Sequence, residues 1–158
     1  MAIMMNVAGF SDAFAAAVRV EVSPGVEAMI ASLPGIVILK LLAWADRRRE
    51  NPKDAIDVVT LLRSYHEAGN ENRIYEEARA LAALEAVGYD PELAGAWLLG
   101  HDAAIMASES TIASLETLLI ASTKERLIED MARAMKGQAD AMHYASLLLE
   151  QFTQGFTA

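Results

Sequence analysis

The feature that most constrains this chain is its division at Ser32, where short alternating segments give way to helical periodicity. Ser32 and Pro34 combine a helix N-cap with a proline in the first helical turn. Beyond them, Ile36, Leu39 and Leu42 recur every three residues and form the apolar stripe of an amphipathic helix. The sequence therefore predicts an α+β protein that is predominantly α-helical.

Helical periodicity continues along the chain and is interrupted by glycine and proline where helices are expected to end and begin. Gly95 and Gly100 lie inside one such segment, where glycine is unfavourable, so we expect them to mark close contacts between helices. The expected helices span about 33–48, 52–66, 71–86, 91–106, 110–120, 123–135 and 139–152. Together they predict a helical bundle.

The segment before Ser32 has the pattern of a β-hairpin. Residues 18–22 alternate apolar and charged side chains, Pro24 and Gly25 favour a turn, and a second apolar segment covers 26–31. A short helix over 11–17, with Ser11 as its N-cap, is expected before the first strand. Two strands alone are marginally stable, so we expect this sheet to be a remnant, or to pair with a segment outside the chain or across a dimer.

Length and composition exclude several classes of protein. With 158 residues the chain is the size of one domain, 1–158, in which a β-containing part (1–32) packs on a helical part (33–158). The chain has no cysteine, which excludes thiolate zinc sites and cysteine nucleophiles. No apolar run approaches the roughly 20 residues of a membrane-spanning helix, and we expect a cytoplasmic protein rather than a membrane protein.

The net charge of −9 argues against a general nucleic-acid binder, because that activity requires clustered basic residues. One segment departs from this acidic average. Between positions 40 and 53 the basic residues are Lys40, Arg47, Arg48, Arg49 and Lys53, and the acids are Asp46 and Glu50. If the chain has an anion site, we expect it in this segment.

Lys40 requires a charged partner, because it interrupts an apolar run and its ammonium group would be costly to bury unpaired. Lys40, Trp44 and Arg47 share one helix face. A helix hairpin would bring Asp54 or Asp57 of the next helix opposite Lys40. This pattern fits two interpretations: an ion pair that fixes two helices, or a lysine and an aspartate that line a phosphate or nucleotide pocket with Arg47 at its rim.

The order Lys40, Trp44-x-x-Arg47 and Lys53-Asp54-x-x-Asp57 resembles the region after the catalytic sheet in nucleotidyltransferases of the AbiEii/AbiGii toxin type. Weaker resemblance extends to 5–10 and 94–102. It implies a nucleotidyltransferase-like fold and the transfer of a nucleoside monophosphate from an NTP to a hydroxyl, RNA included. It also implies that Lys40 and Asp57 are retained pocket residues, with Asp54 as an alternate and Lys40 and Arg47 at the phosphate.

The chemistry of that family requires a Gly-Ser loop for the triphosphate and neighbouring carboxylates for Mg²⁺. No Gly-Ser followed by an Asp-x-Asp pair precedes Val18, so we expect a truncated or degenerate protein that lacks the main catalytic motif. Glu21 has the strand setting of a third carboxylate and would assist Mg²⁺, but it equally fits the solvated face of an amphipathic strand. Mg²⁺ and an NTP are the expected cofactor and substrate of an active form.

The alternative function is a non-catalytic helical module for protein interaction or dimerisation, which binds a partner protein or a second copy through the β edge. The three histidines lack metal-ligand spacing, and His101 with Asp102 fits a pair on a helix surface. Trp44 and Trp97 are expected to anchor the core rather than to stack on bases.

Overall fold

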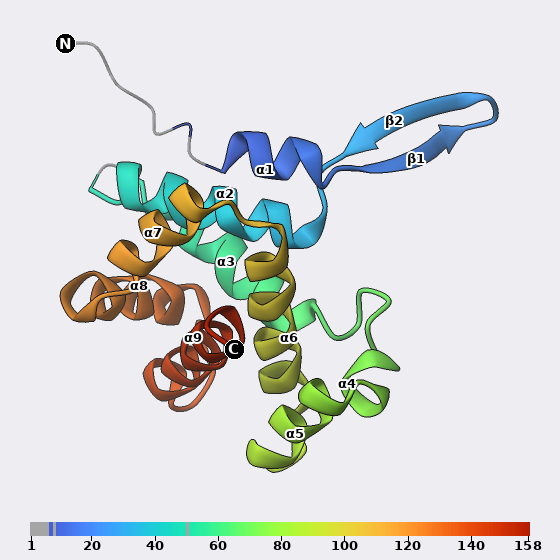
Figure 1. Cartoon of the computed structure of the whole chain (residues 1–158). Coiled ribbons are helices and arrows are strands. Elements are labelled where there is room, and N and C mark those ends of the chain that lie inside the picture. Colours follow the sequence, from blue (N-terminus) through green and yellow to red (C-terminus); the bar gives the residue numbers. More distant parts are fainter. Residues whose placement is uncertain (1–6, 8, 50) are drawn as a thin grey trace, which may run out of the picture.

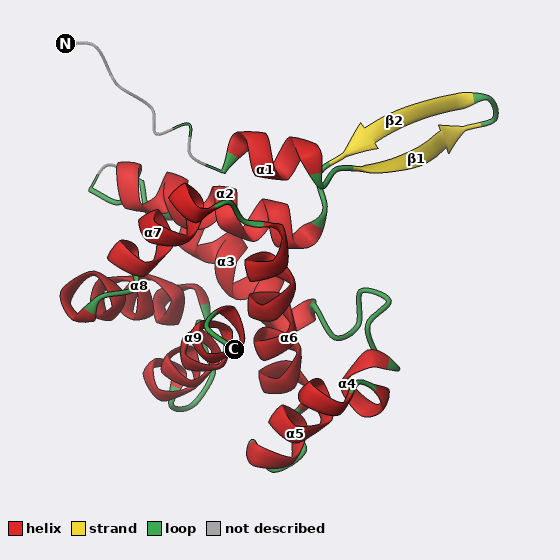
Figure 2. Cartoon of the chain, viewed as in Figure 1, coloured by secondary structure: helices red, strands yellow, loops and turns green. Residues whose placement is uncertain are grey.

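The computed structural model of the chain describes residues 7, 9–49 and 51–158. It has a helical body with a short N-terminal helix packed on it, and a β-hairpin extends from one side (Figures 1 and 2). The described elements are α1 (Phe10–Ala15), β1 (Val18–Ser23), β2 (Val26–Ile30), α2 (Leu33–Arg47), α3 (Lys53–Ser64), α4 (Arg73–Glu76), α5 (Ala78–Ala86), α6 (Pro91–Met106), α7 (Glu109–Leu118), α8 (Ala121–Ala134) and α9 (Ala141–Phe156). The predominantly helical α+β fold is confirmed.

Two N-caps explain why the long helices α2 and α6 begin where they do. The Ser32 hydroxyl accepts a hydrogen bond from the Gly35 backbone N–H at 3.3 Å, and the Asp90 carboxylate accepts one from Leu93 at 3.1 Å. A proline stands in the first turn of both helices. The expectation for the first helix was less accurate, because α1 begins at Phe10 and its N-cap is Gly9 rather than Ser11.

Helices α2, α3, α6 and α9 form the centre of the core, with α8 packed on α3 and α9 (Figure 1). Both tryptophans are buried, as the sequence predicts: Trp44 on α2 is fully inaccessible and Trp97 on α6 nearly so. Phe152 of α9 is also fully buried. None of the helices in the described ranges is long and apolar enough to cross a membrane.

Helices α6 and α9 touch backbone to backbone at two glycines. A Cβ atom at Gly100 would lie 2.0 Å from the carbonyl oxygen of Phe152, and one at Gly155 would lie 1.9 Å from that of Trp97. No side chain fits at either position, because these distances are far below van der Waals contact. The expected close contact at Gly100 is confirmed, and at Gly95 a Cβ would likewise meet His66 at 2.9 Å.

The single helix expected over 71–86 is wrong, because the structure divides it into α4 and α5. The break lies at Glu77, whose backbone is extended with φ −78° and ψ 119°. Its carboxylate reaches back to the Arg73 guanidinium at 2.5 Å, so the acid is fixed to the preceding helix.

The expected surface pair of His101 and Asp102 is also wrong. The Asp102 carboxylate accepts hydrogen bonds from Arg73 at 2.7 Å and from the Tyr65 hydroxyl at 2.6 Å, and its side chain is largely buried. Burial, together with the hydrogen bond to Asp102, raises the pKa of Tyr65 above its ordinary value. His101 stacks on Trp97 with 5.2 Å between the ring centroids. Asp102 therefore ties α6 to α3 and α4.

The hairpin is antiparallel and projects away from the helical body (Figure 2). Val18 pairs with Ile30, and Val20 pairs with Ala28. Every residue of β1 is exposed, and in β2 only Ala28 is partly buried. The two strands predicted from the alternating pattern are confirmed, and this sheet contains no third strand from the described part of the chain.

Candidate functional site

Helices α2 and α3 pack against each other and carry the residues singled out in the sequence. Asp54 lies in the first turn of α3, where the helix dipole favours a negative charge. It is only 5% exposed and faces α2, because Ala55, Val58 and Leu62 on the same helix are buried in the core. The helix hairpin thereby presents a buried carboxylate to the basic end of α2.

Lys40 reaches across to α3 and contacts both candidate aspartates. Its Nζ atom lies 2.5 Å from Asp57 and 3.3 Å from Asp54. The hydrogen bond to Asp57 raises the pKa of the Lys40 amine above its ordinary value, although partial burial acts in the opposite direction. The lysine is therefore a fixed cation at the surface of the α2–α3 hairpin.

Arg47 completes a group of four charged residues, the α2–α3 cluster: Lys40, Arg47, Asp54 and Asp57. The Arg47 guanidinium donates a hydrogen bond to Asp54 at 2.8 Å, so Asp54 binds two cations. Asp54 is buried, whereas the side chains of Arg47 and Asp57 are 59% and 50% exposed. The structure thus brings together four of the five residues that the sequence singled out.

Glu21 is the predicted site residue that does not join the α2–α3 cluster. It lies on the projecting hairpin, where its carboxylate accepts a hydrogen bond from the Gly25 backbone N–H at 2.8 Å and so closes the turn. It is exposed and pairs across the sheet with Glu27. This placement matches the interpretation of Glu21 as a charge on a solvated strand face.

The α2–α3 cluster is not a metal site in this arrangement. Its two carboxylates are bound by Lys40 and Arg47, and Mg²⁺ requires free oxygen ligands. Across ranges 9–49 and 51–158, no group of three or more acids or histidines has the geometry to hold a metal ion. The described residues therefore do not fit Mg²⁺, and Glu21 and Glu27, which pair across the hairpin, have no third acid or histidine in the described part of the chain to complete a metal set.

The remaining basic residues of this segment extend the positive charge beside the cluster. Arg48 lies over the Trp44 ring at 5.3 Å from its centroid, which is a cation–π contact. Arg49 and Lys53 are exposed. The four charges of the cluster balance, and these three residues outnumber the two further acids of the segment, Asp46 and Glu50, so residues 40–57 carry a net charge of +1.

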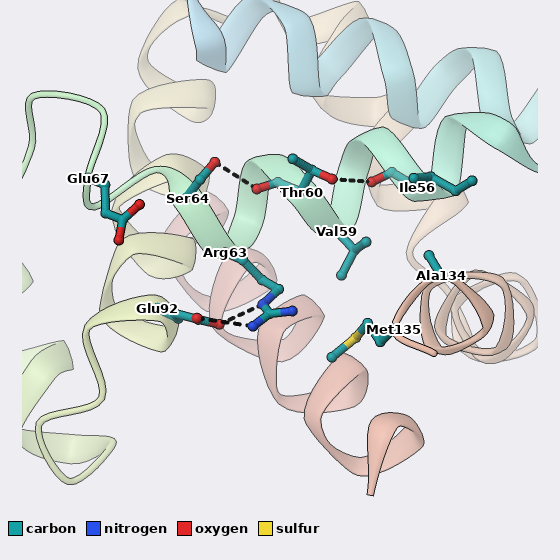
Figure 3. Close-up of a pocket in the computed structure, with 9 residues that line it drawn as sticks. All are labelled: Ile56, Val59, Thr60, Arg63, Ser64, Glu67, Glu92, Ala134 and Met135. Carbon is teal, nitrogen blue, oxygen red and sulfur yellow. Dashed lines mark hydrogen bonds and ion pairs between the residues drawn. The ribbon is translucent and has the colours of Figure 1, made fainter. Parts of the chain in front are cut away.

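A hollow that no sequence pattern indicated lies on the other side of α3. This cavity of about 290 Å³ lies between α3, α6 and the end of α8 (Figure 3). Arg63 and Glu92 point toward each other at its wall and are joined at 2.8 Å and 3.2 Å. The Tyr144 hydroxyl donates to Glu92 at 3.1 Å. Arg63 is 29 positions from Glu92 in the sequence, and Tyr144 is 52 positions from it. Local spacing therefore could not predict these contacts.

Glu92 gives the fold an acid-sensitive contact. Burial opposes its charge, but the hydrogen bonds from Arg63 and Tyr144 outweigh burial and lower its pKa below 4.5. A carboxylate with a lowered folded pKa contributes stability above its unfolded pKa, and this contribution is lost as the pH falls through the folded value. We expect Glu92→Gln to lose less stability than the wild type between about pH 5 and pH 3.

Urea unfolding followed by circular dichroism at several pH values measures this difference. Glu125→Gln, which removes an exposed acid from α8, is the matched control and should follow the wild type. An equally steep loss of stability in Glu92→Gln and the wild type would contradict the prediction.

A family model described as nucleotidyl transferase AbiEii toxin, type IV toxin–antitoxin system, matches residues 1–155. The matched range includes the α2–α3 cluster, the hairpin and all the helices in full except the end of α9. Neither the comparison with curated proteins nor the comparison with solved structures gives a significant match.

Proposed function

The chain belongs to the family of AbiEii nucleotidyl transferase toxins, and on this premise we propose that its α2–α3 cluster binds the phosphate groups of a nucleoside triphosphate. The observation that carries this proposal is the position of Lys40, whose amine is held at the surface by Asp57 and Asp54. A lysine fixed in this way loses little side-chain entropy when it binds an anion.

The four residues of the cluster have different roles in the proposal. Lys40 contacts phosphate directly, and Arg47 contacts it from the rim. Asp57 orients Lys40 from a half-exposed position on α3. Asp54 is buried and stays in place, where it fixes both cations. Nearby Arg48, Arg49 and Lys53 outnumber Asp46 and Glu50, so residues 40–57 carry a net charge of +1 in a chain whose net charge is −9.

In this family the bound nucleotide is the donor of a nucleoside monophosphate to a hydroxyl, and RNA is a candidate acceptor. The described residues do not assemble carboxylates for Mg²⁺, so we assign the α2–α3 cluster to nucleotide recognition and assign no transfer step to it. Transfer would require acids from elsewhere. The family description, a type IV toxin–antitoxin system, also implies an antitoxin partner.

Isothermal titration with ATP or GTP, with and without Mg²⁺, tests the proposal. We expect the wild type to bind and Lys40→Ala to bind at least about tenfold more weakly, because a charge-assisted contact to phosphate is lost. Lys136→Ala, which removes an exposed lysine between α8 and α9, is the matched control and should bind as the wild type does. Circular dichroism of each variant verifies that the fold is intact.

Two results would refute nucleotide recognition at this site. The first is the absence of any heat with wild-type protein. The second is an unchanged affinity in Lys40→Ala, which would leave the α2–α3 cluster as a structural ion-pair group only. Lys40→Arg separates charge from geometry, because it retains the cation and should keep more affinity than Lys40→Ala.

A further inference from the structure

Residues 9–31, which comprise α1 and the hairpin, form an N-terminal arm with little attachment to the helical body (Figure 1). Of the six residues of α1, all of them described, only Ala13 is buried. Phe10 and Phe14 are 48% and 79% exposed, so the aromatic side chains of α1 contribute little apolar burial. The two strands pack mainly on each other, and Figure 2 shows the hairpin pointing away from the helices. The arm therefore has few of the buried contacts that hold the longer helices in place.

Small residues make the apolar contact between the arm and α2. A Cβ atom at Gly35 would lie 3.3 Å from the Cα atom of Ala13, so the two backbones are close together. A Cβ atom at Gly9 would lie 2.9 Å from the side chain of Ile38 and 3.1 Å from that of Leu42. The fit is close, but one alanine and one glycine bury little apolar area, and the free energy of burial scales with that area. The arm therefore needs a further contact to stay closed.

Asp12 supplies this contact from α1 by capping another helix. Its carboxylate accepts hydrogen bonds from the backbone N–H and from the hydroxyl of Ser108, both at 2.9 Å. Ser108 is the N-cap residue of α7, and its own side chain makes no capping hydrogen bond there. A carboxylate at this position binds a free N–H group and lies at the positive end of the helix dipole. The hydrogen bond from the Ser108 N–H lowers the pKa of Asp12, although partial burial acts in the opposite direction.

We propose that the arm detaches from the helical body as one unit, by rotation about residues 31 and 32, and that Asp12 is the residue that keeps it closed. Ser32 stays with the body, because its hydroxyl caps α2 and donates to the Met106 sulfur at 3.9 Å. The strand pairing and the ion pair between Arg19 and Glu27 lie within the arm, so opening does not break them. Helix α1 melts on opening, because six residues are too few for a stable helix without tertiary packing.

Opening changes the surface of α2, the helix that carries Lys40. Ile38 and Leu42 are buried in the closed form, and Gly9 of the arm lies against both side chains. Detachment of the arm exposes part of their apolar surface, whereas α2 keeps its packing on α3 and α6. The helical body therefore stays folded, and the open form is an accessible state of the native protein. This inference concerns the arm and does not depend on nucleotide recognition by the α2–α3 cluster.

Hydrogen exchange of the full chain, followed by mass spectrometry, tests the proposal. We expect the amides of α1 to exchange much faster than those of α6 and α9. Their exchange should be insensitive to urea below about 1 M, because local opening exposes little surface, whereas exchange in α6 and α9 should accelerate. Asp12→Ala should speed exchange in α1 by about fivefold or more, because a helix cap is lost. Ser11→Ala, which truncates the exposed neighbouring side chain on α1, is the matched control and should exchange no faster than the wild type.

An introduced disulfide distinguishes detachment of the arm from fraying of an attached helix. The chain has no cysteine, and a Cβ atom at Gly35 would lie 3.3 Å from the Cβ atom of Ala13, close to the separation of about 3.8 Å in a disulfide. Ala13→Cys combined with Gly35→Cys should therefore join α1 to α2 on oxidation. Exchange in α1 should then be at least about tenfold slower than in the reduced form of the same variant.

Three results would overturn the proposal. The first is protection of α1 as strong as that of α6, which would mean that the arm opens only when the whole chain unfolds. The second is equal exchange of α1 in Asp12→Ala and Ser11→Ala, which would remove the assigned role of Asp12. The third is equal exchange in the oxidised and reduced forms of the cysteine variant. None of these results bears on the titration of Lys40 variants with nucleotide.

Discussion

Gly100→Ala is expected to destabilise the protein by about 3 kcal/mol, although alanine normally favours a helix over glycine. The new Cβ would lie 2.0 Å from a backbone oxygen of Phe152 and 2.9 Å from the backbone nitrogen of Phe156. Backbone atoms inside a helix cannot rotate away as a side chain can, so α6 and α9 must move apart. That separation opens the packing around Phe152, which is fully buried.

Chemical denaturation measures this effect, and Gly35→Ala is its matched control. Gly35 is also within a helix, but a Cβ there would lie 3.3 Å from Ala13, a tight contact that small shifts relieve. We expect Gly35→Ala to remain within about 1 kcal/mol of the wild type. Gly155→Ala should resemble Gly100→Ala, and the double variant should cost less than the sum, because both substitutions separate the same helices. Wild-type stability in Gly100→Ala would contradict the described crossing.

Asp130→Ala is expected to cost about 2 to 4 kcal/mol, the second largest effect that we predict. The Asp130 side chain is completely buried on α8, and its carboxylate accepts a hydrogen bond from the Trp44 indole N–H at 3.1 Å. It also binds the Arg133 guanidinium at 2.9 Å. Removal of the carboxylate leaves a buried indole donor without a partner and detaches α8 from α2.

A double-mutant cycle with Trp44→Phe isolates the Trp44–Asp130 contact in this prediction. If the hydrogen bond is the cause, Asp130→Ala should cost less in the Trp44→Phe background than in the wild type, because no indole donor is left unpaired. Glu129→Ala removes a neighbouring, half-exposed acid and should change the free energy of unfolding by less than about 1 kcal/mol. If Asp130→Ala lowers the free energy of unfolding equally in both backgrounds, the destabilisation comes from the lost contact with Arg133 or from packing, and not from the indole hydrogen bond.

The sequence predicted those parts of the fold that depend on neighbours along the chain. Ser32 caps the helix that it was expected to begin, the helix expected over 91–106 has these bounds, and the alternation from residue 18 became a strand. Lys40 met both Asp54 and Asp57 because these acids lie within two turns of a connection between adjacent helices. Short sequence separation and helical periodicity were sufficient to predict these contacts.

Contacts between distant segments could not be predicted in this way. Trp44 and Asp130 are 86 positions apart, and nothing in either local pattern indicates that they are partners. Gly155 lies beyond the end of the helix expected over 139–152, yet it is half of the α6–α9 crossing. The break at Glu77 was missed because alanine-rich flanks favour a continuous helix, and no glycine or proline marks the extended backbone at Glu77.

The crossing of α6 and α9 also imposes an order on synthesis and folding. Residues 91–106 leave the ribosome well before residues 141–156, so the groove around Gly100 stays open while α7 and α8 are still being translated. During that interval Trp97, Leu98 and their neighbours have no permanent cover, and such surfaces attract chaperones or other nascent chains. The contact between α6 and α9 therefore forms only after α9 has been made.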